Sequence, residues 1–123
     1  RDSSTWSTSH DIWGTDDMGL YQTQRYGYGS FGYRFDVPNG TYEVELHFAE
    51  LYHNAAGKRV FDVIIEGQTV LDNYDAFVAA GGRFVANTRV FTAVVRDGQL
   101  NVVFALGPAD FPMINALRVL KTD

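Results

Sequence analysis

Aromatic residues with polar neighbours are the part of this sequence best suited to binding a ligand. Tyr26 follows Gln24 and Arg25, and Tyr52 precedes His53. A sugar ring has an apolar face of C–H groups and a rim of hydroxyls, so a flat aromatic beside hydrogen-bonding groups suits it. The same aromatics could instead cap the ends of a hydrophobic core, and the sequence leaves both interpretations open. The candidate site residues are Trp6, Tyr26, Tyr28, Tyr52, His53, Asp110 and Phe111.

Metal binding and catalysis have weaker support. His10, His47 and His53 lie far apart in the sequence, and the chain has no cysteine, so no metal-ligand spacing is present. No Gly-x-Ser-x-Gly motif occurs. A glycosidase needs two carboxyl groups facing each other across a bond, whereas Glu43 and Glu45 fall on a predicted exposed strand face. We therefore expect no metal, no cofactor and no catalysis.

One glycine-rich stretch, residues 27–32, fits Gly-x-Gly-x-x-Gly literally. The dinucleotide-binding form of this motif requires a helix to begin at the last glycine, within a βαβ unit. The residues that follow alternate like a strand instead, so the sequence does not support a nucleotide site. We expect a flexible turn, or a loop whose glycines let Tyr26 and Tyr28 lie flat against a ligand.

The stretch 37–52 is the predicted centre of the fold. A turn is expected at its start, because Pro38 presets φ and Gly40 accepts a positive φ. Strict alternation follows, which predicts a strand with one buried and one exposed face. Tyr52 is expected in the loop that ends this strand. The side chains predicted to face the core are Tyr42, Val44, Leu46 and Phe48.

Other strands surround this one. Asp97-Gly98 is typical of a two-residue hairpin turn between strands at 89–96 and 100–106. A short helical turn is expected at 76–80. Residues 1–19, which include Trp6, are predicted to form an ordered loop because disordered segments are poor in tryptophan. The remaining predicted strands are 20–23, 31–37, 59–65, 69–72 and 113–120, with loops at 25–30 and 107–112.

Short, evenly spaced strands without a long helix predict an all-β fold, either a two-sheet sandwich or a barrel. The chain has 123 residues. A domain of this size buries roughly two thirds of its unfolded surface, which is enough for a hydrophobic core without disulfides. We therefore expect residues 1–123 to form a single domain.

The charge of the chain limits its partners. The formal net charge is −5 and no cluster of lysine or arginine is present, which argues against nucleic acid and anionic membrane surfaces. No apolar run long enough to cross a membrane occurs, and the chain begins with polar residues rather than a signal peptide. The lack of cysteine is compatible with an exported protein that has no disulfides.

A series of short motifs extends over nearly the whole chain. They are Leu-Tyr-Gln-Thr-Gln-Arg-Tyr at 20–26, Val-Pro-Asn-Gly-Thr-Tyr at 37–42, Leu-His-Phe-Ala-Glu-Leu-Tyr at 46–52, Arg-Val-Phe-Asp-Val at 59–63 and Asp-Phe-Pro-Met-Ile-Asn-Ala-Leu at 110–117. In type and order they resemble those of the malectin domain, a carbohydrate-binding module. The resemblance implies a two-sheet antiparallel β-sandwich of jelly-roll type that binds glucose-containing oligosaccharides or glucans without catalysis. It also implies an extracellular or cell-surface setting, often within a larger multidomain enzyme or surface protein.

Carried over position by position, the resemblance puts the sugar-binding residues of the family on Tyr26, Tyr52 and Asp110, with Trp6 as a further aromatic. The tyrosines would stack on sugar faces, and Asp110 would accept hydrogen bonds from hydroxyls. His53 stands where the family often has a second aromatic, which would weaken stacking or change the preferred sugar.

The sequence leaves other possibilities open. The family's first strand is absent before Arg1, so one sheet edge is expected to be unpaired or covered by a partner. The main alternative to sugar binding is a protein-interaction or structural β-sandwich that has lost the sugar site, and His53 favours it. A small glycosidase would need two facing carboxylates in one cleft. Arg25 is expected to support the site rather than contact the ligand.

Overall fold

The computed structural model of the chain describes residues 3–122, and strands make up most of it. The helical segments are η1 (Met18–Leu20) and α1 (Ala76–Ala80), so the helical turn expected at 76–80 is confirmed. None of the helices in the described residues is long and apolar enough to cross a membrane. The strands are β1 (Ser3–Ser7), β2 (Thr23–Gly27), β3 (Phe31–Asp36), β4 (Gly40–Phe48), β5 (Val60–Ile65), β6 (Gln68–Tyr74), β7 (Asn87–Val95), β8 (Gln99–Ala109), β9 (Met113–Ile114) and β10 (Ala116–Lys121).

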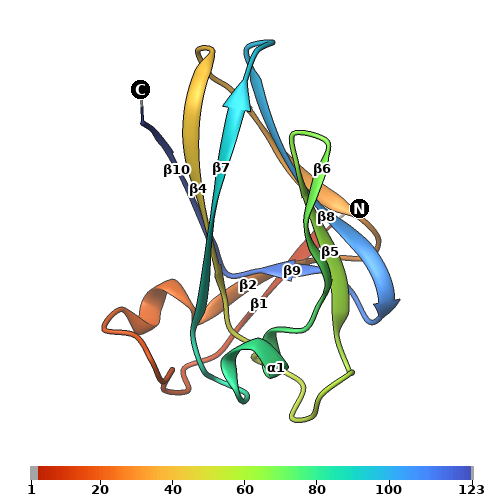
Figure 1. Cartoon of the computed structure of the whole chain (residues 1–123). Helices are drawn as coiled ribbons and strands as arrows, with labels where there is room; N and C mark the ends of the chain where they lie inside the picture. Colours follow the sequence, from red (N-terminus) through yellow and green to blue (C-terminus); the bar gives the residue numbers. More distant parts are fainter. Residues whose placement is uncertain (1–2, 123) are drawn as a thin grey trace.

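The strands form two main antiparallel sheets and a smaller third one. One main sheet has the order β10-β4-β7 and the other β3-β8-β5-β6. In Figure 1 these sheets stand on the left and right, and the third sheet, β1-β2-β9, crosses their lower end. The sheets do not close into a barrel, so the predicted all-β sandwich is confirmed.

Strand β4 supplies one wall of the core, as its alternation predicted. Tyr42, Val44, Leu46 and Phe48 are all buried, while the residues between them are partly exposed. They belong to one cluster with residues from the opposite sheet, which include Phe61, Val63, Val102 and Phe104. Alternating faces from two sheets thus meet in a single core.

The hairpin predicted at Asp97-Gly98 is wrong. Strand β7 pairs with β4, whereas β8 pairs with β3 and β5, so this turn crosses from one sheet to the other. It is tied to the turn that links β3 and β4: Val37 N donates to Gly98 O at 3.1 Å, and Gly98 N donates to Asn39 Oδ1 at 2.8 Å. A local turn signal fixes a chain reversal, but burial decides which strands pair.

The single final strand expected at 113–120 is divided between two sheets. Strand β9 pairs with β2, and β10 pairs with β4. Asn115 lies at the corner, where its Oδ1 accepts from Ala49 N at 2.8 Å and its Nδ2 donates to Tyr21 O at 2.9 Å. The amide side chain replaces ladder hydrogen bonds at the corner, because both of its polar ends can pair with backbone groups.

Two loop boundaries also differ from those predicted. Residues 107–109 continue β8 rather than opening a loop, and Ala109 is paired with Val60 of β5. Gly107 permits this close approach, because a Cβ added there would lie 2.3 Å from Val60 O. The expected strand at 20–23 is mostly η1 and a turn, and β2 occupies part of the predicted 25–30 loop.

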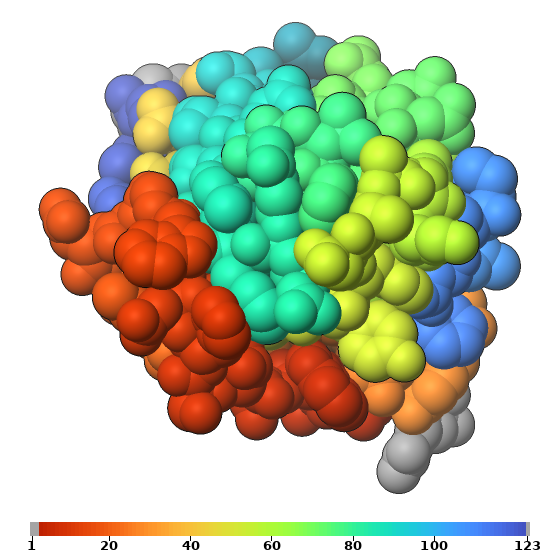
Figure 2. Space-filling view, turned by 90° about the horizontal axis from the view of Figure 1, so that it is seen from below, coloured from red at the N-terminus to blue at the C-terminus, as the bar shows by residue number. Residues whose placement is uncertain are grey.

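The N-terminal segment is ordered, as its tryptophans indicated, but it includes strand β1 in addition to loop. Its Ile12 and Tyr21 are buried in a second small cluster with Ala49 and Leu51. Figure 2 shows this end of the molecule, where the N-terminal segment in red lies beside the yellow-green and teal segments of the middle of the chain. This packing fixes β1 and β2 against the loop that follows β4.

Candidate functional site

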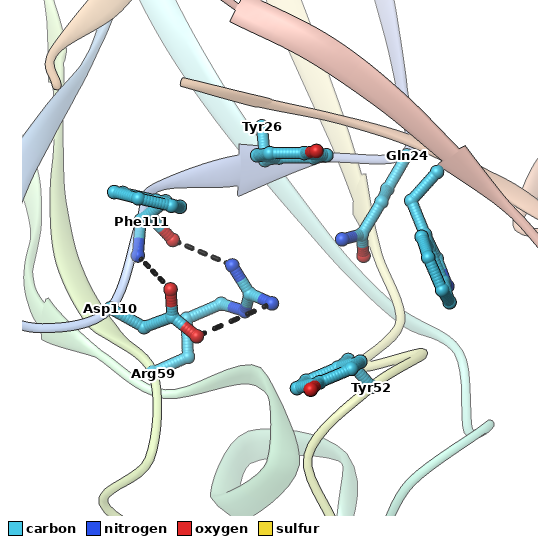
Figure 3. Close-up of a pocket in the computed structure, with 7 residues that line it drawn as sticks. Gln24, Tyr26, Tyr52, Arg59, Asp110 and Phe111 are labelled. Carbon is cyan, nitrogen blue, oxygen red and sulfur yellow. Dashed lines mark hydrogen bonds and ion pairs between the residues drawn. The ribbon is translucent and has the colours of Figure 1, made fainter. Parts of the chain in front are cut away.

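A pocket of about 300 Å³ lies where β1, β2 and the loops around residues 52 and 110 meet. Figure 3 shows the side chains that line it. Most of the candidate residues from the sequence are brought together here, although they come from separate parts of the chain. The lining residues are Trp6, Gln24, Tyr26, Tyr52, Arg59, Asp110 and Phe111.

Strand pairing sets which side chains reach this pocket from β1 and β2. Trp6 on β1 is opposite Gln24 on β2 in the antiparallel ladder. Gln24 and Tyr26 are two residues apart on one strand, so they share a face. Arg25 lies between them and points away, and its Nη1 donates to Ser3 Oγ at 2.8 Å. Arg25 therefore holds β1 to β2 from the other face.

Tyr26 and Phe111 form one aromatic wall of the pocket. Their rings are nearly parallel, with an interplanar angle of 14° and centroids 6.1 Å apart. Tyr28 contacts both rings edge-on, at 5.6 Å from Tyr26 and 5.5 Å from Phe111. Tyr28 is exposed and is not among the lining residues, so it contacts this wall without lining the pocket.

Tyr52 forms the opposite wall and is largely exposed. Its side of the pocket faces Tyr26 across open space in Figure 3. Tyr52 is 58% exposed, and Trp6 contacts it edge-on with ring centroids 6.0 Å apart. An exposed ring in a fixed orientation leaves one aromatic face available for a ligand.

A buried ion pair behind the pocket joins the two loops that carry these rings. Glu50 accepts a hydrogen bond from Arg59 Nε at 2.8 Å, and its other oxygen accepts from the backbone N–H groups of Tyr52 and His53 at 3.1 and 3.2 Å. Arg59 Nη1 donates to the carbonyl of Phe111 at 2.7 Å. The pair thus fixes the loop at residues 50–53 relative to the loop at 110–111.

Asp110 is held in place as an ionised hydrogen-bond acceptor. Its backbone has φ of +54°, in the left-handed region that aspartate tolerates better than most residues. Its Oδ1 accepts from Phe111 N at 2.7 Å, and its Oδ2 is hydrogen-bonded to His53 Nε2. Burial by itself raises the pKa of this carboxyl, but the hydrogen bonds from His53 and Phe111 N and the charge of Arg59 outweigh burial and lower the pKa from its ordinary value.

His53 supports the pocket without lining it. Its ring is bonded to Asp110 and contacts Tyr52 edge-on, with centroids 4.9 Å apart. Sequence reasoning treated His53 as a candidate ligand contact in place of an aromatic. The structure instead puts it between the acidic and the aromatic parts of the site.

Sequence reasoning missed Gln24 and Arg59 as lining residues and Glu50 as their support. Gln24 is 2% exposed, and its Oε1 has no hydrogen-bond partner. Arg59 Nη2 lies 4.0 Å from Asp110 Oδ2, which is too long for a direct hydrogen bond. In the sequence, Glu50 lies two residues before Tyr52, whereas Arg59 directly precedes β5 and has no candidate aromatic beside it.

The pocket can therefore bind a molecule that has both apolar faces and hydroxyl groups. Aromatic rings stand on two sides, Asp110 offers an ionised acceptor, and Arg59 and Gln24 add polar groups. Asp110 is the one carboxylate among the lining residues that the structure describes. Residues 3–122 contain no group of three or more histidine, aspartate or glutamate side chains positioned to hold a metal ion.

Comparison with known proteins agrees with the motifs in the sequence. The model of the Malectin domain family matches residues 1–117. Malectin-B of Xenopus laevis is 33% identical over 122 residues, covering 86% of this chain and 43% of that protein. Receptor-like protein 4 of Arabidopsis thaliana is 40% identical over 92 residues, covering 72% of this chain and 15% of that protein. The chain thus spans less than half the length of these relatives.

Solved structures share the fold. The ANXUR2 extracellular domain from Arabidopsis thaliana has a TM-score of 0.86 at 20% identity, covering 98% of this chain and 39% of that chain. Bacteroides uniformis beta-glucuronidase has a TM-score of 0.88 at 23% identity, covering 100% of this chain and 14% of that chain. At these identities the likeness concerns the fold alone.

Proposed function

Because this chain belongs to the malectin domain family, we propose that it binds carbohydrate without catalysing a reaction on it. The ligand occupies the pocket between Tyr26 and Tyr52. The observation that carries this proposal is the position of aromatic rings on two sides of one pocket that also contains the ionised carboxylate of Asp110.

The aromatic walls suit the apolar faces of a sugar ring. Tyr26 and Phe111 extend one nearly parallel surface, and Tyr52 with Trp6 supplies the other. C–H groups of a sugar pack against such π faces, and the exposure of Tyr52 lets the ligand continue out of the pocket. These contacts favour a short stretch of a longer saccharide over an isolated small ion.

The polar groups suit the hydroxyl rim. Arg59 Nη2 and Asp110 Oδ2 are 4.0 Å apart. One sugar hydroxyl between them could accept from the guanidinium and donate to the carboxylate, so that both charged groups gain a hydrogen bond. We propose glucose-containing oligosaccharides or glucans as the ligand class. Stacking and a few such hydrogen bonds leave only a small net free energy of binding after the entropy lost in ordering the ligand. The Kd is therefore on the order of 10 μM to 1 mM.

The carboxylates argue for binding rather than hydrolysis. A glycosidase uses two carboxyl groups on either side of the scissile bond. Asp110 is the acidic residue in the described lining, and the nearby Glu50 is already bonded to Arg59 and to backbone N–H groups. The likeness to a beta-glucuronidase covers 14% of that enzyme, which fits a binding module attached to a catalytic part.

We also propose that residues 1–123 form one domain of a larger protein that acts outside the cell or at its surface. The relatives include a receptor-like protein, and the fold neighbours include an extracellular domain. Animal proteins named malectin are relatives as well. Locating the natural protein in fractionated cells tests the proposed location outside the cell or at its surface.

A protein-interaction role is the second candidate. The solved structure of plant peptide RALF23 in complex with FER and LLG2 has the same fold, with a TM-score of 0.82 at 25% identity, covering 98% of this chain and 33% of that chain. A glycan array that reports millimolar binding separates the two roles. Binding of glucose-containing oligosaccharides supports the first role, and a blank array with an intact fold supports the second.

A further inference from the structure

The side chain of Gln24 is buried in the pocket with a polar atom left unpaired. It is 2% exposed, and its Oε1 accepts no hydrogen bond. Buried amide oxygens are almost always paired, because an unpaired one loses its hydration without compensation. An exception such as this one requires an explanation.

The fold does not supply that explanation. Backbone pairing places Gln24 opposite Trp6, with β9 continuing the same sheet on the other side of β2. Figure 3 shows the amide directed into the pocket, above Tyr52. An apolar side chain of the same length would fill this volume without a buried unpaired oxygen, so packing alone does not favour glutamine here.

None of the neighbouring groups that the structure describes donates a hydrogen bond to this oxygen. Arg59 donates to Glu50 and to the Phe111 carbonyl. Asp110 is an acceptor itself and is bonded to His53. A donor for the amide oxygen is therefore expected from a molecule that enters the pocket.

We propose that Gln24 is a specificity-determining residue, whose amide hydrogen-bonds one hydroxyl of the sugar ring at the inner end of the pocket. This inference rests on the proposed function. A primary amide has an acceptor and a donor, and a hydroxyl can pair with both. The terminal torsion of glutamine is broad, so the oxygen can turn toward the ligand. The site then selects neutral sugars that carry this hydroxyl over those that lack it, because a missing hydroxyl leaves the amide unpaired.

The test combines a variant with deoxy sugars. Titration calorimetry with glucose disaccharides of every linkage first identifies the tightest binder, and each monodeoxy analogue of that disaccharide is then titrated into wild type and Gln24→Met. Methionine matches the length of glutamine and removes the hydrogen bond. We expect the variant to bind the parent sugar about 10-fold more weakly, as for the loss of one hydrogen bond. One monodeoxy analogue should bind both proteins equally.

Several outcomes would overturn the inference. If the parent sugar binds the variant as tightly as wild type, or if every analogue loses affinity equally in both proteins, Gln24 makes no selective contact. If no disaccharide binds wild type, the proposed function fails and this inference fails with it.

A second measurement needs no variant. In wild type, the side-chain NH₂ signals of Gln24 should shift further on adding the parent disaccharide than on adding the monodeoxy analogue that wild type binds most weakly. Identical shifts with both sugars would contradict the inference even if Gln24→Met does not fold.

Discussion

The side chains of Glu50 and Arg59 form an ion pair that is buried on both sides, with Nε 2.8 Å from Oε1 and exposures of 1% and 5%. Each partner also bonds to a loop of the pocket: Glu50 to the N–H groups of Tyr52 and His53, and Arg59 to the carbonyl of Phe111. The positions of the aromatic walls thus depend on residues that lie beneath them.

Glu50→Gln is expected to destabilise the fold and weaken sugar binding together. The substitution keeps the size of the side chain but leaves the guanidinium of Arg59 buried without its counter-charge, which costs about 3–5 kcal/mol. Urea denaturation measures the free energy of unfolding. Arg118→Gln is the control, because the Arg118–Glu45 pair at 3.9 Å is exposed on the arginine side and should contribute less than about 1 kcal/mol. Equal losses from the two substitutions would contradict the structural role of the buried pair.

Lowering the pH should reduce the stability of the fold through protonation of Asp110. The pKa of this carboxyl is lowered from its ordinary value: burial raises the pKa, but the hydrogen bonds from His53 and Phe111 N and the charge of Arg59 lower it by more. Because the pKa of Asp110 is lower in the folded state than in the unfolded state, its ionisation stabilises the fold. This contribution is complete at pH values above the unfolded-state pKa, and it is lost as the pH falls through the folded-state pKa. In His53→Ala the pKa should rise, so the loss begins at a higher pH. Carboxyl ¹³C NMR of Asp110 follows the titration.

The control for this titration is His10→Ala. The His10 ring stacks on Phe84 and bonds to the Asp11 carbonyl, away from Asp110, so this variant should leave the Asp110 titration unchanged. An Asp110 titration that is the same in wild type and His53→Ala would show that the His53 bond does not lower the pKa.

Phe48→Ala should remove about 3–5 kcal/mol from the free energy of unfolding, through lost burial and the cavity left behind. Phe48 is fully buried, with ring centroids 4.6 Å from Tyr74 and 6.0 Å from Phe61. Tyr52→Ala is the matched comparison, since an exposed ring should cost less than about 1 kcal/mol. Thermal or urea unfolding measures both. A small loss for Phe48→Ala would place the core elsewhere.

No hydrolysis is expected. Incubation with malto-, cello- and laminari-oligosaccharides should release no reducing ends, because Asp110 lacks a facing second carboxylate among the described lining residues. Turnover that survives stringent purification and disappears in Asp110→Asn would overturn the non-catalytic assignment.

Local patterns in the sequence predicted the core well and the strand pairing less well. The alternation from Tyr42 to Phe48 predicted burial correctly because the two faces of a strand follow from neighbouring residues alone. Asp97-Gly98 gave a false hairpin, since β7 and β8 find their partners in different sheets. The break at Asn115 also depends on distant contacts, with Ala49 and Tyr21.

The same limit applies to the pocket. Aromatics beside polar residues at strand ends indicated Tyr26 and Tyr52, which the structure brings to one cavity. Gln24 was noted only as a polar neighbour of Tyr26, because its burial arises only when β1 and the loop at residue 52 pack around it. Glu50 and Arg59 are likewise unremarkable as single residues, and their pairing emerges only in the folded chain.

Titration calorimetry of glucose disaccharides into wild type and Tyr52→Ala tests the central claim most directly, with Asp110→Asn as a milder change that keeps an acceptor oxygen. Wild type should bind with a Kd on the order of 10 μM to 1 mM. Tyr52→Ala should lose most of this binding while its melting temperature stays close to that of wild type, and Asp110→Asn should lose less. Equal heats from wild type and Tyr52→Ala would remove Tyr52 from the site, and the absence of heat with every disaccharide would contradict carbohydrate binding by this pocket.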